Sequence, residues 1–217
     1  MSNIKYILFD LDGTLTNPKI GITTSVAYAL DKMGIHVDDL EKLTPFIGPP
    51  LTDSFMEFYD MSKEEAEKAI VYYRERFSVT GLFENEVYEG IPEMLEQLSK
   101  TKELAIASSK PTVFVERILE HFGIKDYFHH IIGSNLDGTR CNKDEVVEAA
   151  IDEFHSARKE EIIMVGDRKF DIEGGHAHGV KVIGVRFGFA GEGELEAAGA
   201  DYIAETVAEL SEQLEML

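Results

Sequence analysis

The chain has 217 residues, 44% of them hydrophobic, which is enough to bury the core of one domain and a sizeable insertion. Its 41 acidic and 21 basic side chains give a formal net charge of −20, which argues against nucleic-acid polymers and anionic membrane surfaces as main partners. The first residues contain no long apolar segment, and Cys141 is the only cysteine. We therefore expect a cytoplasmic protein without internal disulfides, and a monomer or weak homodimer.

The first predicted element is a buried strand that ends in two acidic residues. The apolar run Ile4–Phe9 shows no alternation, so both faces of this strand should be covered. Asp10 and Asp12 follow directly, and Gly13 allows a sharp turn. An isolated Asp-Gly pair is most often only a turn. Two carboxylates after a buried strand indicate more, because ligands bind at the carboxyl ends of strands in open α/β sheets.

Residues 16–82 show only helical patterns. Apolar residues recur at helical spacing from Ile22 to Met33, and Ser62–Glu65 fits a capping box that begins another helix. The intervening segment Thr44–Pro50 is rich in proline and must be non-helical. We expect residues 16–82 to form an α-helical cap, inserted into a core made of residues 1–15 and 83–217.

Helices alternate with short apolar strands after the helical segment. Strands are predicted at residues 104–107, 131–132, 162–165, 182–185 and 202–203, with helical patterns between them. Such alternation is typical of a parallel sheet with crossover helices on both faces. The expected fold is therefore α/β, a Rossmann-like three-layer core with a parallel sheet plus the inserted helical cap.

Polar residues follow several of these predicted strands, at positions that share one edge of a parallel sheet. Four carboxylates should converge there, and converging carboxylates repel one another unless a cation lies among them. An all-oxygen site of this kind suits Mg²⁺. A serine hydroxyl and a lysine ammonium at the same edge could bind phosphate oxygens, so the pattern indicates a metal-assisted phosphoryl site. The residues are Asp10, Asp12, Asp167 and Asp171 with Ser108 and Lys143.

These segments resemble the four motifs of the haloacid dehalogenase-like phosphohydrolases, in the same order and with plausible spacing. They are Asp10–Thr14, Ser108, Lys143, and Gly166–Asp167 with Asp171. The helical insertion also lies where this family has its cap. The resemblance is greatest to the branch of phosphoglycolate phosphatases and small 5′-nucleotidases. It implies Mg²⁺-dependent hydrolysis of a small phosphomonoester.

The resemblance also implies roles for the motif residues. Asp10 would be the nucleophile that forms an aspartyl-phosphate, and Asp12 the general acid and base. Ser108 and Lys143 would bind the transferred phosphoryl group. The implied metal site comprises Asp10, the Asp12 carbonyl and Asp167, with Asp171 supporting metal waters or Lys143. The expected substrate contacts are Gly13, Thr14, Ser109, Lys110 and Arg168, with Gly48 in the cap.

Alternatives to this interpretation remain at the level of the sequence. Lys110 competes with Lys143 as catalytic lysine, because Lys143 follows Asn142 where the family often has glycine. A sugar phosphomutase of the same superfamily would pass the phosphoryl group to a second hydroxyl. A non-catalytic Mg²⁺-binding phospho-receiver module would share the aspartate at a strand end, but Asp12 and the inserted cap argue against it. Phosphoglycolate, a nucleoside 5′-monophosphate and a sugar phosphate all fit the motifs.

Overall fold

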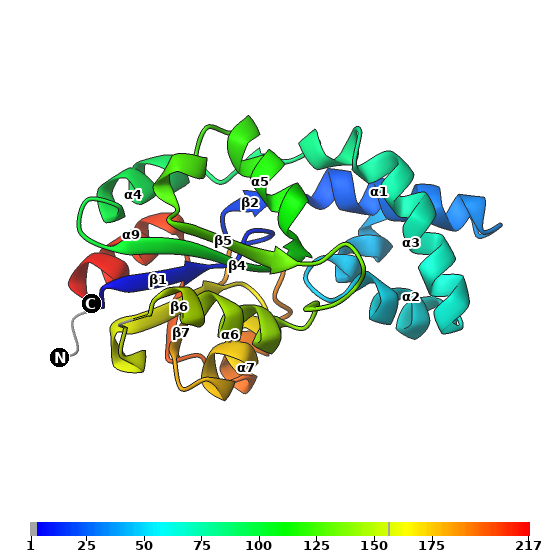
Figure 1. The fold of residues 1–217 in the computed structure, drawn as a ribbon. Helices are drawn as coiled ribbons and strands as arrows, with labels where there is room; N and C mark the ends of the chain where they lie inside the picture. Colours follow the sequence, from blue (N-terminus) through cyan, green and yellow to red (C-terminus); the bar gives the residue numbers. More distant parts are fainter. Residues whose placement is uncertain (1–3, 156) are drawn as a thin grey trace. The chain divides into compact units, whose positions relative to one another are not determined.

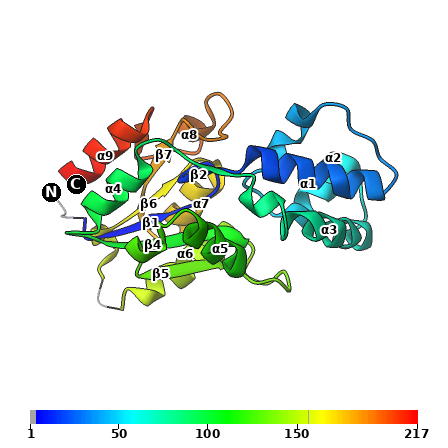
Figure 2. The same ribbon diagram turned by 90° about the horizontal axis from the view of Figure 1, so that it is seen from above.

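The computed structural model describes residues 4–155 and 157–217, which belong to two compact units (Figures 1 and 2). The first unit contains the chain up to Asn17 together with Val87–Leu217, and the second is Pro18–Glu86. Within the described ranges, no helix has the length and apolar character needed to cross a membrane.

A six-stranded parallel sheet forms the centre of the first unit, in the order β5-β4-β1-β6-β7-β8. The central strand β1 places Phe9 opposite Ile106 of β4 and Val165 of β6. Ile7, Leu8 and Phe9 are fully buried, as expected for a strand paired at both edges and covered on both faces. The strands are β1 (Tyr6–Phe9), β4 (Glu103–Pro111), β5 (His130–Ser134), β6 (Ile162–Gly166), β7 (Lys181–Val185) and β8 (Tyr202–Ala204).

Helices cover both faces of this sheet and complete three layers (Figures 1 and 2). The helices α6 (Lys143–Glu153) and α7 (Lys169–Ala177) lie on one face, where Val147 and Ile172 join a buried cluster with Leu8. The opposite face carries α4 (Ile91–Leu98), α5 (Thr112–His121) and α9 (Val207–Met216), and the short α8 (Glu194–Ala197) follows β7. The predicted α/β, Rossmann-like fold with a parallel sheet is therefore confirmed.

The second unit consists of helices around a small aromatic core. The capping box predicted at Ser62 and Glu65 begins α3, with the Ser62 N–H donating to Glu65 Oε2 at 2.8 Å. The rings of Phe46 and Phe55 pack with centroids 5.0 Å apart. Its elements are α1 (Lys19–Lys32), α2 (Leu51–Tyr59), α3 (Lys63–Phe77) and the 3₁₀ helices η1 (Leu40–Phe46) and η2 (Gly81–Phe83).

The two units divide at 17/18 and 86/87, whereas the sequence pattern placed the insertion at 16–82. Thr16–Asn17 is not helical: it forms the short strand β2, which pairs with β3 (Glu86–Val87). The Gly21 N–H donates to the Glu84 carbonyl at 3.0 Å, and Arg76 pairs with the Glu84 carboxylate at 2.7 Å. These contacts hold the residues after Leu82 to the helical unit. Strands of two residues are too short to produce a periodic sequence signal.

Truncation of the central strand should destabilise the first unit strongly. We expect Leu8→Ala to lower the free energy of unfolding by about 3 kcal/mol, because Leu8 is fully buried and its removal leaves a cavity. The matched control Leu136→Ala removes the same atoms from a side chain in a residue that is 46% exposed, and should cost less than about 1 kcal/mol. Urea unfolding of both variants measures the difference, and equal losses would contradict the central role of β1.

Candidate active site

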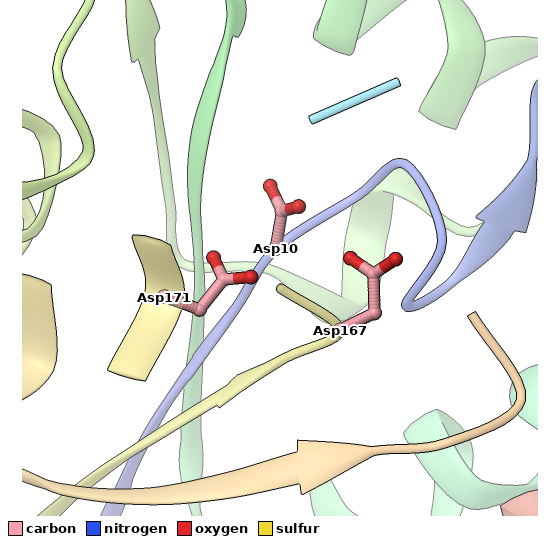
Figure 3. Close-up of side chains that lie close together, drawn as sticks. All are labelled: Asp10, Asp167 and Asp171. Carbon is pink, nitrogen blue, oxygen red and sulfur yellow. The ribbon is translucent and has the colours of Figure 1, made fainter. Parts of the chain in front are cut away.

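Three aspartates, two at neighbouring strand ends and one in the helix that follows, meet at the carboxyl edge of the sheet (Figure 3). Asp10 follows β1, Asp167 follows β6, and Asp171 lies in the first turn of α7. The Asp10 N–H donates to the Val165 carbonyl at 2.9 Å, which continues the pairing of β1 with β6. All three aspartates are buried, and one carboxylate oxygen from each lies within 4.8 Å of the others. The structure thus brings these three predicted residues together.

Lys143 begins α6 and connects two of these carboxylates. Its Nζ lies 2.8 Å from Asp10 Oδ1 and 2.7 Å from Asp171 Oδ1, and it donates to the Ala107 carbonyl at 3.0 Å. Two carboxylate oxygens and one carbonyl oxygen therefore surround the ammonium group. Burial alone would lower the pKa of Lys143, but the two carboxylates outweigh it and raise that pKa. Lys143 is therefore a permanent cation in contact with Asp10.

Lys110, the alternative catalytic lysine, lies against a different carboxylate. Its ammonium group forms a close ion pair with Asp12, and the two side chains are only 6% and 12% exposed. Lys110 is the penultimate residue of β4, the strand whose first part pairs with β1. The two lysines thus divide the site: Lys143 contacts Asp10 and Asp171, and Lys110 contacts Asp12.

Burial disfavours the ionised form of three carboxylates of the site. Burial raises the pKa of Asp12, although the Lys110 ammonium acts in the opposite direction. Burial, with the charges of Asp171 and Asp10, raises the pKa of Asp167 well above its usual range. Burial also raises the pKa of Asp171, against the opposing effect of Lys143. In each case burial removes the water that would solvate the ionised form.

The composition of the site fits a divalent cation bound by oxygen ligands. With all four carboxylates ionised, their four negative charges would face only the two positive charges of the lysines, which would leave two negative charges unbalanced. Among the described residues, the buried Asp167 Oδ1 atom has no hydrogen-bond partner. A buried oxygen of this kind requires a donor or a cation. The cluster Asp10, Asp167 and Asp171 could therefore hold a metal ion such as Mg²⁺.

Glycines give these carboxylates the space that they occupy. A Cβ atom on Gly13, whose φ is +88°, would lie 2.1 Å from Asp167 Oδ2. One on Gly188 would lie 2.3 Å from the Asp167 Cβ, and one on Gly166 would lie 2.1 Å from the Asp171 Cγ. Any larger residue would have to displace a carboxylate or the backbone beside it.

The residues predicted to contact phosphate lie at the same edge of the sheet, with different degrees of burial. Ser108 is 2% exposed, and its Oγ accepts a hydrogen bond from the Lys110 N–H at 3.4 Å. Thr14 is fully buried, and its Oγ1 has no partner among the described residues. Ser109 is half-buried. A buried hydroxyl without a partner among the described residues, as in Thr14, is a suitable donor for an anionic ligand.

The other two predicted substrate contacts are Arg168 and Gly48. The Arg168 Nε donates to Glu194 Oε1 at 2.8 Å, so its guanidinium is held toward α8, while its backbone N–H donates to Asp171 Oδ2 at 3.0 Å. Gly48 belongs to the second unit, in the turn between η1 and α2, with a φ of 110°. The substrate contacts expected of both residues stay predictions.

Sequence reasoning missed the contribution of the loop after β7. The Phe189 N–H donates to Asp167 Oδ2 at 2.7 Å, and Gly188 makes room for the same side chain. Tyr88 packs on Phe187 with ring centroids 5.2 Å apart, and burial with the carboxylates of Asp167 and Asp12 raises its pKa. The available signal was positional, because the loop after β7 leaves the same edge of the sheet as Asp10 and Asp167.

Comparison with known proteins gives consistent matches along the chain. A family model described as haloacid dehalogenase-like hydrolase matches residues 7–185. A 5′-nucleotidase of Pseudomonas aeruginosa is 47% identical over 210 residues, covering 96% of this chain and 95% of the relative. The tyrosine-protein kinase PtkA of Mycobacterium tuberculosis is 35% identical over 211 residues, covering 96% of this chain and 72% of the kinase.

A solved structure is similar over the whole chain. The crystal structure of a predicted phosphatase from Clostridium acetobutylicum superposes with a TM-score of 0.97 at 46% identity, and each chain is covered completely. This similarity extends through both compact units of the chain. Because the family model spans most of the chain, the family predicted from the motifs is confirmed: the chain belongs to the haloacid dehalogenase-like hydrolases, as a phosphatase of that family.

Proposed function

We propose that the chain hydrolyses small phosphomonoesters with Mg²⁺, through an aspartyl-phosphate formed on Asp10. The observation that carries this proposal is the contact of the Lys143 ammonium with both Asp10 and Asp171. This contact holds the Asp10 carboxylate in place beside a cluster that suits a metal. The relative named 5′-nucleotidase supports a substrate of the nucleoside 5′-monophosphate type, with phosphoglycolate as the other candidate.

Two aspartates would share the chemistry between them. An Asp10 oxygen attacks phosphorus while the bond to the leaving alcohol breaks, and Asp12 gives its proton to the leaving oxygen. Asp12 then takes a proton from water, which attacks the aspartyl-phosphate, releases phosphate and regenerates Asp10. Burial shifts the pKa of Asp12 upward, the direction that a general acid needs, and the contact with Lys110 holds its carboxyl group in place.

The remaining motif residues would bind the metal and the phosphoryl group. Mg²⁺ would be held by the carboxylates of Asp10 and Asp167 and the Asp12 carbonyl, with Asp171 supporting Lys143 and metal waters. The bound ion supplies positive charge that screens the repulsion between nucleophile and phosphate. Lys143 and Ser108 would bind the transferred oxygens. The further substrate contacts that we propose are Gly13, Thr14, Ser109, Lys110, Arg168 and Gly48.

Phosphate release tests the chemistry directly. We expect Mg²⁺-dependent release from phenyl phosphate, phosphoglycolate or nucleoside monophosphates, stopped by chelator and lowered at least about 10³-fold by Asp10→Asn. The matched control Asp152→Asn changes an exposed aspartate on α6 and should leave the rate unchanged. If folded protein with bound Mg²⁺ released no phosphate from any compound, the hydrolase proposal would be wrong. Transfer of the phosphoryl group to a second sugar hydroxyl would instead identify a mutase.

Thermal unfolding tests the metal site independently of turnover. Asp167 is buried beside Asp171 and Asp10, which raises its pKa, so without metal its charge is a burden. We expect Asp167→Asn to unfold at an equal or higher temperature than the wild type in chelator. At Mg²⁺ concentrations about 100 times the Kd, the wild type should gain about 5–10 °C and the variant much less. An equal Mg²⁺-induced gain in both proteins would exclude Asp167 as a ligand.

The glycine packing around Asp167 gives a sensitive geometric test. Gly188→Ala would place a Cβ 2.3 Å from the Asp167 Cβ and 2.5 Å from the Gly13 carbonyl oxygen. We expect it to weaken Mg²⁺ binding and lower kcat/KM at least about tenfold, with a loss of stability of about 1–3 kcal/mol. Gly191→Ala is the control, because its nearest neighbour would be 3.5 Å away. Identical behaviour of the two variants would contradict the tight packing.

A further inference from the structure

The loop of residues 135–142, between β5 and α6, carries a positively charged side chain at the edge of the sheet where the site lies. It leaves the carboxyl end of β5, the same edge of the sheet as Asp10, and leads into Lys143. The Asn135 N–H donates to the Thr139 carbonyl at 3.0 Å, and the Thr139 N–H donates to Asp137 Oδ1 at 3.0 Å. These hydrogen bonds hold the loop in one turn conformation and so fix the backbone position of the residue after Thr139.

That residue is Arg140, and its conformation is unusual. Its φ of 51° lies in the left-handed region, which costs a non-glycine residue of order 1–3 kcal/mol and persists only where the surroundings impose it. The Arg140 Nε donates to the Gly133 carbonyl at 2.9 Å. A Cβ on Gly133 would lie 2.4 Å from the Lys110 carbonyl oxygen. The guanidinium is therefore anchored at Gly133, which packs against the Lys110 backbone near the end of β4.

Arg140 also differs from other arginines in its charge environment. Within residues 4–155 and 157–217, no carboxylate forms an ion pair with Arg140, although the protein carries a net charge of −20. Arg168 pairs with Glu194 at 2.8 Å, and Arg186 pairs with Glu196 at 2.6 Å. A half-buried guanidinium whose Nε is held by a backbone carbonyl, and whose other nitrogens form no ion pair in the described part of the chain, is suited to an anionic ligand.

We propose that Arg140 binds a second anionic group of the substrate, a carboxylate or phosphate carried by the leaving group. The inference rests on the proposed function and narrows its substrate class to phosphate compounds whose leaving group is itself negatively charged, so it favours phosphoglycolate over the nucleoside 5′-monophosphates, whose leaving group is neutral. Lys143 and Ser108 serve the transferred phosphoryl group, so Arg140 is left for the other end of the molecule. The Cα atoms of Arg140 and Lys143 are at most about 11 Å apart, which suits a small substrate.

Steady-state kinetics of the full chain with Mg²⁺ test this assignment. Phosphoglycolate carries a carboxylate and pyrophosphate a second phosphate, while phenyl phosphate carries neither. We expect Arg140→Gln to lower kcat/KM about 10- to 100-fold, mainly through KM, for whichever charged compound the wild type prefers. Phenyl phosphate turnover should change less than about twofold. Glutamine, like arginine, is a non-glycine residue without a β-branch, so the left-handed backbone at position 140 is equally strained in the variant and the wild type.

Two further variants separate binding from folding. Arg140→Lys should restore part of the loss, because it keeps the charge without the planar donors. Arg158→Gln breaks an ion pair with Glu161 at 3.1 Å just before β6. It should leave kcat/KM unchanged for every substrate. Equal losses on charged and uncharged substrates, unchanged kinetics in Arg140→Gln, or no turnover of either charged compound by the wild type would overturn the proposal. Mg²⁺-dependent phenyl phosphate hydrolysis in the same assays would still support the proposed function.

Discussion

The site depends on charge compensation at the end of β1. Asp10 and Asp171 are buried, and two such carboxylates are tolerated because one ammonium group, that of Lys143, touches both at 2.7–2.8 Å. The compensation is incomplete, and the shortfall is the property that a divalent cation would correct. Asp167 has the most strongly perturbed environment because neither lysine reaches it in an ion pair among the described residues.

The fold brings these charges together from distant parts of the chain. Each side chain follows a parallel strand or begins a helix at the same edge, so the register of β1, β4 and β6 sets their separations. Lys110 and Asp12 are 98 residues apart in sequence and form an ion pair. The site also requires glycines, because a Cβ atom on Gly13 or Gly188 would overlap the Asp167 side chain. Backbone geometry and charge balance are thus two aspects of one arrangement.

Residue types and their position after strands were enough to predict the family, the sheet and the meeting of Asp10, Asp167 and Asp171. The sequence could not show which lysine, Lys110 or Lys143, contacts Asp10. Both lie at the same edge of the sheet, and they differ in the carboxylates that their side chains reach. The N–H of Phe189 was invisible because a backbone donor has no residue signature. The limits of the helical unit were displaced because β2 and β3 are two residues each and carry no periodicity.

The pairing of β2 with β3 has a consequence for how this chain can vary. It holds Thr16–Asn17 beside Glu86–Val87, so the intervening helical unit begins and ends at neighbouring points of the backbone. For the sheet, the whole insertion is then equivalent to a closed loop, and the entropy of closing a loop grows only slowly with its length. Helical units of quite different size could be exchanged at this junction with little change in the folding of the sheet. The inserted segment can therefore vary in length with little effect on the stability of the sheet, while the strand ends that carry the carboxylates keep their positions.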